Sequence, residues 1–250
     1  MGFMNNKIAL VTGASSGIGR ASARAFAQEG ATVVVSDVAM EGGLETVRMI
    51  QEAGGEASFV TCDVANMDEV EKLIAHTVDT YGKLDCAFNN AGIAGEIAAT
   101  GDCTEENWYR VINVNLHGVW HCMKYEIPQM LKQGFGTIVN TSSISGLHAV
   151  RNQGAYSASK HGVIGLTKTA ALEYANSGIR INALCPGWTT TGMAGTPEVH
   201  DTDPSFLAKY ACNRPGTPEE QAEAVLWLCS ERASFVNGHA MIVDGGRMTL

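Results

Sequence analysis

Tyr156 and Lys160 are the residues whose types and spacing best suit chemistry in this chain of 250 residues. They are four apart in a segment with helical spacing, so their side chains share one face of the helix. A phenol with a pKa of about 10 is a poor base at neutral pH, but a nearby ammonium favours the phenolate and lowers that pKa. The pair could therefore provide a proton acceptor for alcohol oxidation. Taken alone, such a pair is more often exposed on a helix surface.

Ser143 strengthens the catalytic interpretation. It lies 13 residues before Tyr156, just beyond the apolar run at 137–141, which reads as a strand. A serine hydroxyl at that strand end could hydrogen-bond the oxygen of a substrate while the tyrosine takes its proton.

A glycine-rich turn at residues 12–19 could hold a dinucleotide. It follows a short apolar strand and opens a helix whose apolar residues recur at helical spacing. Gly13 and Gly17 allow a positive φ or close backbone approach, and Gly19 lets the helix pack on the strand. The N–H groups at the start of that helix suit a diphosphate. A glycine cluster alone could also be an ordinary loop.

Asp37 supports the dinucleotide interpretation. It ends a β-branched run 18 residues after Gly19, where a carboxylate accepts hydrogen bonds from an adenosine ribose. This carboxylate would repel a 2′-phosphate, and Ser15, Ser16 and Val38 supply no cation to hold one. The sequence therefore predicts NAD rather than NADP as the cofactor.

The elements that must position these residues alternate between strand and helix. Strands are predicted at residues 8–11, 31–37, 57–62, 83–88, 137–141, 180–184 and 240–243, and helices after the glycine turn and at 68–81, 105–131, 156–176 and 218–230. This pattern predicts one α/β domain over residues 1–250, a doubly wound (Rossmann) parallel sheet of about seven strands with helices on both faces. The long irregular segment at about 188–217 is a candidate substrate lid.

Polar and small residues follow several of these strands, at the edge where open parallel sheets bind ligands. Asp63 and Val64 follow the third strand and are placed to meet an adenine. Residues 89–92, 142–146 and 186–191 follow the fourth, fifth and sixth strands. The sequence therefore predicts a binding crevice along one edge of the sheet.

The composition argues against several classes of partner. A net charge of −9 disfavours nucleic acid and anionic membrane surfaces. No apolar stretch is long enough to span a membrane, and the first seven residues do not resemble a signal peptide. The seven scattered cysteines suit reduced thiols, so a cytoplasmic protein is expected.

Two further patterns favour other chemistry, but weakly. His117 and His121 could share a metal ion, yet no third ligand is evident, so no metal is expected. Residues 13–17 match the Gly-x-Ser-x-Gly elbow of hydrolases. Only about a dozen residues precede this turn, too few to supply the earlier strand that completes an oxyanion hole in that fold.

The chain resembles the short-chain dehydrogenase/reductase family in its compact branch. The resemblance covers nearly the whole sequence and rests on residues 12–19, Asp63, 89–92, 113–115, Ser143, Tyr156, Lys160 and 186–187. It implies that Tyr156 is the catalytic acid/base, that Ser143 positions the substrate oxygen, and that Lys160 lowers the tyrosine pKa and holds the nicotinamide ribose. It also implies that Asn115 supports a water linking Lys160 to solvent, and that the protein is a homotetramer.

The resemblance also assigns cofactor contacts. Asn90 is expected to line the cofactor, Thr189 to meet the carboxamide and Thr191 to lie near the diphosphate. The full set of expected cofactor residues is Gly13, Ser15, Ser16, Gly17, Ile18, Gly19, Asp37, Val38, Asp63, Val64, Asn90, Ala91, Gly92, Tyr156, Lys160, Pro186, Gly187, Thr189 and Thr191.

The expected function is transfer of hydride between NAD and a secondary alcohol or ketone. The substrate residues are predicted to be Ser145, Leu147, His148, Gln153, Trp188 and Met193, within a wall that also includes Ile93, Ala94, Phe206, Leu207 and Tyr210. Because this wall is mainly apolar and only Arg151 could clamp a carboxylate, a neutral alicyclic or aryl alcohol is expected rather than a hydroxy acid. The alternative is a non-catalytic NAD-binding regulator on the same fold, which has no need of a proton relay.

Overall fold

A computed structural model describes residues 2–191 and 204–249 of the chain. In these residues seven strands form a single sheet in the order β3-β2-β1-β4-β5-β6-β7, and all neighbours are parallel. The strands are β1 (Ile8–Thr12), β2 (Thr32–Asp37), β3 (Glu56–Thr61), β4 (Cys86–Asn89), β5 (Gly136–Thr141), β6 (Ile179–Pro186) and β7 (Ala240–Val243). The order reverses between β1 and β4, which makes the sheet doubly wound, as predicted.

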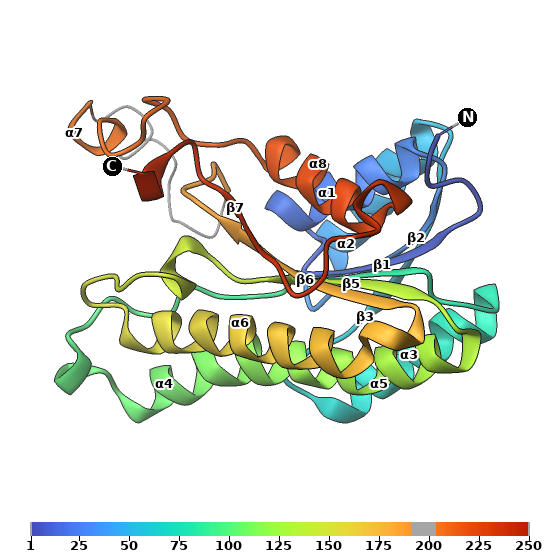
Figure 1. The fold of residues 1–250 in the computed structure, drawn as a ribbon, viewed down its shortest axis with the longest axis horizontal. Coiled ribbons are helices and arrows are strands. Elements are labelled where there is room, and N and C mark those ends of the chain that lie inside the picture. The colour runs from blue at the N-terminus through green and yellow to red at the C-terminus, as the bar shows by residue number, and fades with distance from the viewer. Residues whose placement is uncertain (1, 192–203, 250) are drawn as a thin grey trace.

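Helices cover both faces of the sheet (Figure 1). One face carries α1 (Gly17–Gln28), α2 (Met40–Glu52) and α8 (Pro218–Cys229), and the other carries α3 (Met67–Tyr81), α4 (Glu105–Ile112), α5 (Gly118–Gln133) and α6 (Gly154–Tyr174). The buried side chains accordingly form two apolar clusters, one on each side of the central strands. A parallel sheet buried on both faces requires strands with little polar alternation, and β1 is buried along its whole length.

The predicted strands all overlap strands of the structure, with ends that differ by up to three residues. Helix α2 has no counterpart in the sequence analysis. Its first turn holds Gly42 and Gly43, which are poor helix formers, and its N-cap residue Ala39 makes no side-chain cap. Glycine is needed at position 43, because a Cβ there would lie 2.0 Å from the Phe59 ring.

The single helix predicted at 105–131 is wrong in one respect. The structure has α4, then a five-residue π-helix at Asn113–His117, then α5. The hydrophobic pattern runs through this segment, so periodicity alone did not predict the wide turn. The π-helix contains Asn115, one of the predicted catalytic residues.

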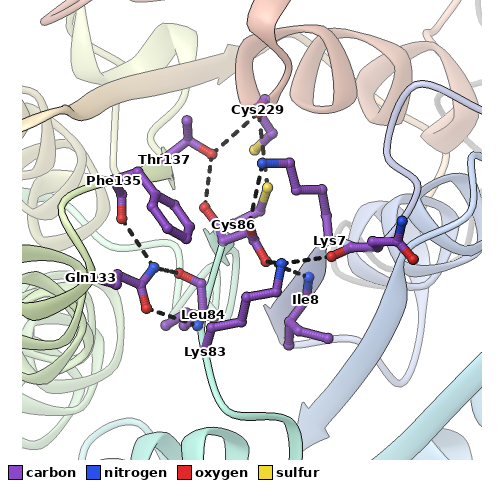
Figure 2. Close-up of polar contacts among 11 residues, drawn as sticks. Lys7, Ile8, Lys83, Leu84, Cys86, Gln133, Phe135, Thr137 and Cys229 are labelled. Carbon is purple, nitrogen blue, oxygen red and sulfur yellow. Dashed lines mark hydrogen bonds and ion pairs between the residues drawn. The ribbon is translucent and has the colours of Figure 1, made fainter.

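The buried carboxylate of Asp85 joins the amino ends of β1 and β4, and its partners Lys7, Ile8 and Lys83 are labelled in Figure 2. The side chain of Asp85 pairs with the ammonium groups of Lys7 at 3.2 Å and Lys83 at 2.8 Å. It also accepts the backbone N–H of Ile8 at 2.9 Å. This anchor lies at the opposite end of the strands from the predicted crevice.

The described parts of the candidate lid, 188–191 and 204–217, are tied to each other. Thr190 N–H donates to the Gly216 carbonyl at 3.0 Å, and Gly216 N–H donates to the Trp188 carbonyl at 2.9 Å. The short helix α7 (Pro204–Leu207) follows the part that lies outside the described residues, which includes Met193. The role of this segment as a lid stays a prediction.

Across the described ranges, none of the helices has the length and apolar character needed to cross a membrane.

Candidate functional site

The glycine turn between β1 and α1 has the backbone geometry that its sequence predicts. Gly13 and Gly17 have φ values of 65° and 52°, in the left-handed region that favours glycine. A Cβ on Gly13 would lie 2.7 Å from Cα of Ala91, and one on Gly19 would lie 2.1 Å from the Gly13 carbonyl oxygen. Side chains at these positions would therefore clash with the backbone of Ala91 and of Gly13 itself.

The amino end of α1 is suited to an anion. Its N-cap residue Ser16 makes no side-chain cap, and its first turn holds no acidic residue. The first N–H groups of a helix have no partner within it, so the positive end of α1 remains available to a diphosphate. Thr191 lies beside this turn, because its Cγ2 would be 3.2 Å from a Cβ on Gly17.

Asp37 is held in place at the end of β2. One carboxylate oxygen accepts the N–H of Ser15 at 3.0 Å and the other accepts the N–H of Ala39 at 2.9 Å. Arg20, the cation near this turn, donates to the carbonyls of Ser15 and Gly42 and to the Thr46 hydroxyl. The carboxylate thus faces the turn, and the guanidinium is occupied by the protein's own oxygens.

The remaining predicted cofactor residues lie along the same edge. Asn90 binds the glycine turn, since its side-chain amide donates to the carbonyls of Thr12 and Gly13 at 3.1 Å. The Thr12 hydroxyl accepts the N–H groups of Asn90 and Ala91 at 3.0 and 3.2 Å. Thr12 was not predicted as a site residue, although it stands directly before the glycines.

Asp63 and Val64 follow β3, next to the end of β2. The neighbouring Cys62 N–H donates to the Asp37 carbonyl at 3.2 Å, and Asp63 itself accepts the Ala65 N–H at 2.9 Å. Val64 is buried, and its carbonyl lies 2.8 Å from Nδ1 of His121.

His121 is therefore engaged with backbone, and its ring centroid is 6.3 Å from that of His117. Within the ranges that the structure describes, no three metal-ligating side chains come together.

Lys160 is buried beneath the ends of β4 and β5. Its Nζ donates to the Thr141 carbonyl at 2.8 Å and lies 5.6 Å from the ring centroid of Tyr156. A Cβ on Gly92 would be 3.5 Å from the same Nζ. Burial lowers the pKa of Lys160 to about 8, so its charge is costly here and is supported by the carbonyl dipole.

Tyr156 and Ser143 lie together, as predicted. Tyr156 is half-buried, and burial raises the pKa of its phenol, while a hydrogen bond with the Ser143 side chain lowers it. Desolvation is the larger of these two effects on the phenol. The Lys160 ammonium is directed to the Thr141 carbonyl, and its expected lowering of the Tyr156 pKa stays a prediction.

The Ser143 hydroxyl is oriented by its own loop. Its oxygen accepts the N–H of Ser145 at 3.1 Å. Because the hydroxyl is the acceptor in this bond, its own hydrogen can be donated to another oxygen. The preceding Ser142 hydroxyl donates to the Lys160 carbonyl at 2.8 Å, so the loop is fastened to α6.

Asn115 reaches the site because of the π-helix. Its side chain accepts the N–H of Ile93 at 2.8 Å and donates to the Ile93 carbonyl at 2.9 Å. It also donates to the Ser159 hydroxyl at 3.3 Å. Asn115 therefore holds the segment after β4 against α6, a role the sequence did not indicate. Its expected support of a water stays a prediction.

The segment after β6 closes the edge of the sheet. The Thr189 hydroxyl lies 3.2 Å from the Gly187 carbonyl and accepts the side-chain amide of Gln221 at 3.2 Å. A Cβ on Gly187 would lie 2.7 Å from Cα of Asp244. Pro186 is the last residue of β6 and lies opposite Val243 of β7. Gln221 was missed by the sequence analysis, because it comes from α8 with no motif around it.

The predicted substrate residues fall into two groups. Ser145, Leu147 and His148 continue from the Ser143 loop, and Nδ1 of His148 lies 2.7 Å from the Ile144 carbonyl. Gln153 opens α6. The second group is aromatic: Trp188 meets Phe206 edge to face at 5.1 Å, and Phe206 meets Tyr210 at 5.8 Å.

A family described as enoyl-(acyl carrier protein) reductase matches residues 13–248. Cyclohexanol dehydrogenase of Acinetobacter sp. (strain SE19) is 46% identical over 241 residues, 96% of this chain and 94% of that protein. Cis-4-hydroxycyclohexanecarboxylate dehydrogenase of Sinomonas cyclohexanicum is 44% identical over 241 residues, 96% of each.

Among solved structures, levodione reductase matches with a TM-score of 0.94 at 35% identity, covering 98% of each chain. Relatives that are named as dehydrogenases and reductases do not favour the alternative of a non-catalytic regulator.

Proposed function

The chain belongs to the short-chain dehydrogenase/reductase family and is an oxidoreductase of CH–OH groups, and on this premise we propose that it oxidises an alicyclic secondary alcohol with NAD. The observation that carries the proposal is that Ser143, Tyr156 and Lys160 lie together, with Lys160 Nζ close to the Gly92 position at the end of β4. Bound NAD supplies a hydride acceptor there.

The choice of NAD over NADP rests on Asp37. Its two oxygens are fixed by backbone N–H groups and keep lone pairs for ribose hydroxyls, whereas a 2′-phosphate would meet a like charge. Among the described residues Arg20 forms no ion pair with Asp37, since its Nε and Nη2 donate to Thr46, Ser15 and Gly42 instead. The glycine turn and the amino end of α1 would hold the diphosphate.

In the proposed mechanism Tyr156 takes the proton of the alcohol. The Ser143 hydroxyl can donate a hydrogen bond to the phenol oxygen of Tyr156, which favours the phenolate. The same hydroxyl can donate to the substrate oxygen. Lys160, fixed by the Thr141 carbonyl, would hold the nicotinamide ribose and place a positive charge near the phenol. Asn115 fixes the backbone of Ile93, directly after Gly92, through two hydrogen bonds.

An alicyclic substrate is proposed from the wall of the site and from the relatives. Leu147, Trp188 and Phe206 provide apolar surface, and the two bacterial relatives are named for alcohols of cyclohexane rings. A cytoplasmic homotetramer is part of the same proposal and rests on family analogy alone.

Initial rates of NADH formation test the proposal. We expect cyclohexanol and its ring-substituted analogues to be oxidised faster than linear secondary alcohols, and NAD to exceed NADP in kcat/KM by about two orders of magnitude. An enoyl thioester with NADH is the comparison, because the family description names enoyl reduction. Turnover of the enoyl thioester without turnover of any alcohol would refute the proposal.

A further inference from the structure

A buried polar cluster lies directly behind the candidate site, between the sheet and helices α5 and α6. It consists of Glu126 on α5, Asn89 on β4, Asn140 on β5 and Thr167 on α6, and each is at most 2% exposed. Helices α5 and α6 also contribute apolar side chains to the core on this face of the sheet, and the sulfur of Met123 lies 3.2 Å from the Asn140 amide. A carboxyl group in such a place is unusual, because burying its charge is costly.

The cluster is joined by hydrogen bonds. The Asn89 amide donates to Oε2 of Glu126 and to the Asn140 side-chain oxygen, both at 3.0 Å. The Asn140 amide donates to the Thr167 hydroxyl at 3.0 Å. Within the described part of the chain, Oε1 of Glu126 and Oδ1 of Asn89 have no partner, and no ion pair includes Glu126.

Burial without an ion pair favours the neutral form of the Glu126 carboxyl group. Burial raises its pKa to about 8, and the Asn89 hydrogen bond lowers it by less. The titratable group that faces it from its own helix is Cys122, whose pKa is raised well above its ordinary value by burial and by Glu126. From β4, β5 and α6 the facing groups are the uncharged side chains of Asn89, Asn140 and Thr167.

Each asparagine of the cluster precedes a residue of the site. Asn90 follows Asn89 and holds the glycine turn through the carbonyls of Thr12 and Gly13. Thr141 follows Asn140, and its carbonyl accepts the Lys160 ammonium. Fixing the two asparagine side chains from behind therefore fixes the strand ends that present these groups.

We propose that Glu126 is a positioning residue for the dehydrogenase reaction, and that its neutral form holds the ends of β4 and β5 through Asn89 and Asn140. The inference rests on the proposed function, since it takes Asn90 and Lys160 as contacts of the cofactor. Ionisation of Glu126 puts an unpaired charge in the core, which loosens the two strand ends and weakens nucleotide binding.

Two variants separate the hydrogen bond from the charge. Glu126→Gln keeps an acceptor for Asn89 and cannot ionise, whereas Glu126→Leu fills the space and offers no acceptor. Glu173→Gln, at an exposed position of α6, is the matched control. The dissociation constant of NAD is measured from protein fluorescence, and kcat and KM from alcohol oxidation, at about pH 7 and about pH 9.5.

We expect Glu126→Leu to raise the NAD dissociation constant about tenfold over the wild type at about pH 7, the cost of one lost hydrogen bond, and Glu126→Gln to keep a dissociation constant close to that of the wild type there. At about pH 9.5 the gap between Glu126→Leu and the wild type should narrow, because the wild type is itself weakened. The wild type should lose more affinity than Glu126→Gln on going to the higher pH. Lys160 titrates in both proteins, so the ratio of their NAD dissociation constants reports the effect of Glu126 alone.

The inference would be overturned, while the proposed function stands, if Glu126→Leu bound NAD as tightly as the wild type. It would also be overturned if the ratio of the NAD dissociation constants of the wild type and Glu126→Gln stayed constant with pH. If Glu126→Leu does not fold, the pH dependence of the ratio between the NAD dissociation constants of the wild type and Glu126→Gln still tests the inference. A wild type that neither binds NAD nor oxidises an alcohol would overturn the proposed function and this inference together.

Discussion

Replacing Glu126 by glutamine should make the stability of the protein less dependent on pH. The carboxyl pKa rises from an ordinary value of 4.5 to about 8 on burial. The folded state therefore keeps the proton over a pH range in which the unfolded state has released it. Each pKa unit corresponds to about 1.4 kcal/mol, so the wild type should lose up to about 5 kcal/mol between those two values.

The sign follows from proton linkage. Stability falls with rising pH wherever the folded state binds more protons, here from about pH 4.5 to about pH 8, and levels off above that range. The glutamine side chain has no such proton, so the free energy of unfolding of Glu126→Gln should rise relative to that of the wild type across this pH range. Partial water entry on ionisation would reduce the effect, and about 2–5 kcal/mol is the expected gain.

Urea unfolding at about pH 5, 7 and 9 measures this difference, with equal protein concentrations so that any subunit association contributes alike. Glu173→Gln serves as the exposed control. A gain by Glu126→Gln that is the same at all three pH values would show that the carboxyl group is not held neutral, and the reasoning from burial would fail.

Three further outcomes are expected. Tyr156→Phe should lower kcat by roughly 10²–10⁴-fold with NAD affinity nearly unchanged, and a variant that kept most of its turnover would show that another group takes the proton. Asp37→Ala should weaken NAD binding and narrow the gap to NADP, so an unchanged ratio of kcat/KM values for the two nucleotides would contradict the ribose assignment. Asp85→Ala should lower the free energy of unfolding by about 1–3 kcal/mol, because two ion pairs and one backbone hydrogen bond are lost. The loss is moderate because Lys7 and Lys83 stay partly exposed to water. KM should not change, and a changed KM would mean that the amino ends of β1 and β4 are coupled to the site.

Much of the fold follows from local pattern. The β-branched run that became β2 and the apolar run that became β1 have no plausible alternative to buried strands, and alternation with helices then requires a parallel sheet. The order of the strands does not follow from local pattern, since it depends on which edge each crossover takes. Helix α2 was missed because its first turn contains two glycines that serve packing rather than helix formation.

The site is predictable where one residue acts through its type and spacing. Gly13, Gly17 and Asp37 are of this kind, because backbone conformation and charge are local properties. The roles of Thr12, Gln221 and Glu126 are not predictable in this way. Each acts by a hydrogen bond to a distant segment, and Glu126 lies in a sequence that reads as an ordinary helix.

The π-helix at Asn113–His117 constrains how this helix pair can change in length. A wide turn accommodates one residue more than an α turn. Deleting a residue there would restore continuous α winding and leave the flanking helices, with the buried Val119 and Met123 of α5, in register. The residues of the turn itself would be displaced, so Asn115 would lose the position from which it binds the backbone of Ile93. Insertions and deletions should therefore be tolerated in the loop before Thr104 and rejected inside this turn, and a deletion scan across 100–120 would locate that boundary.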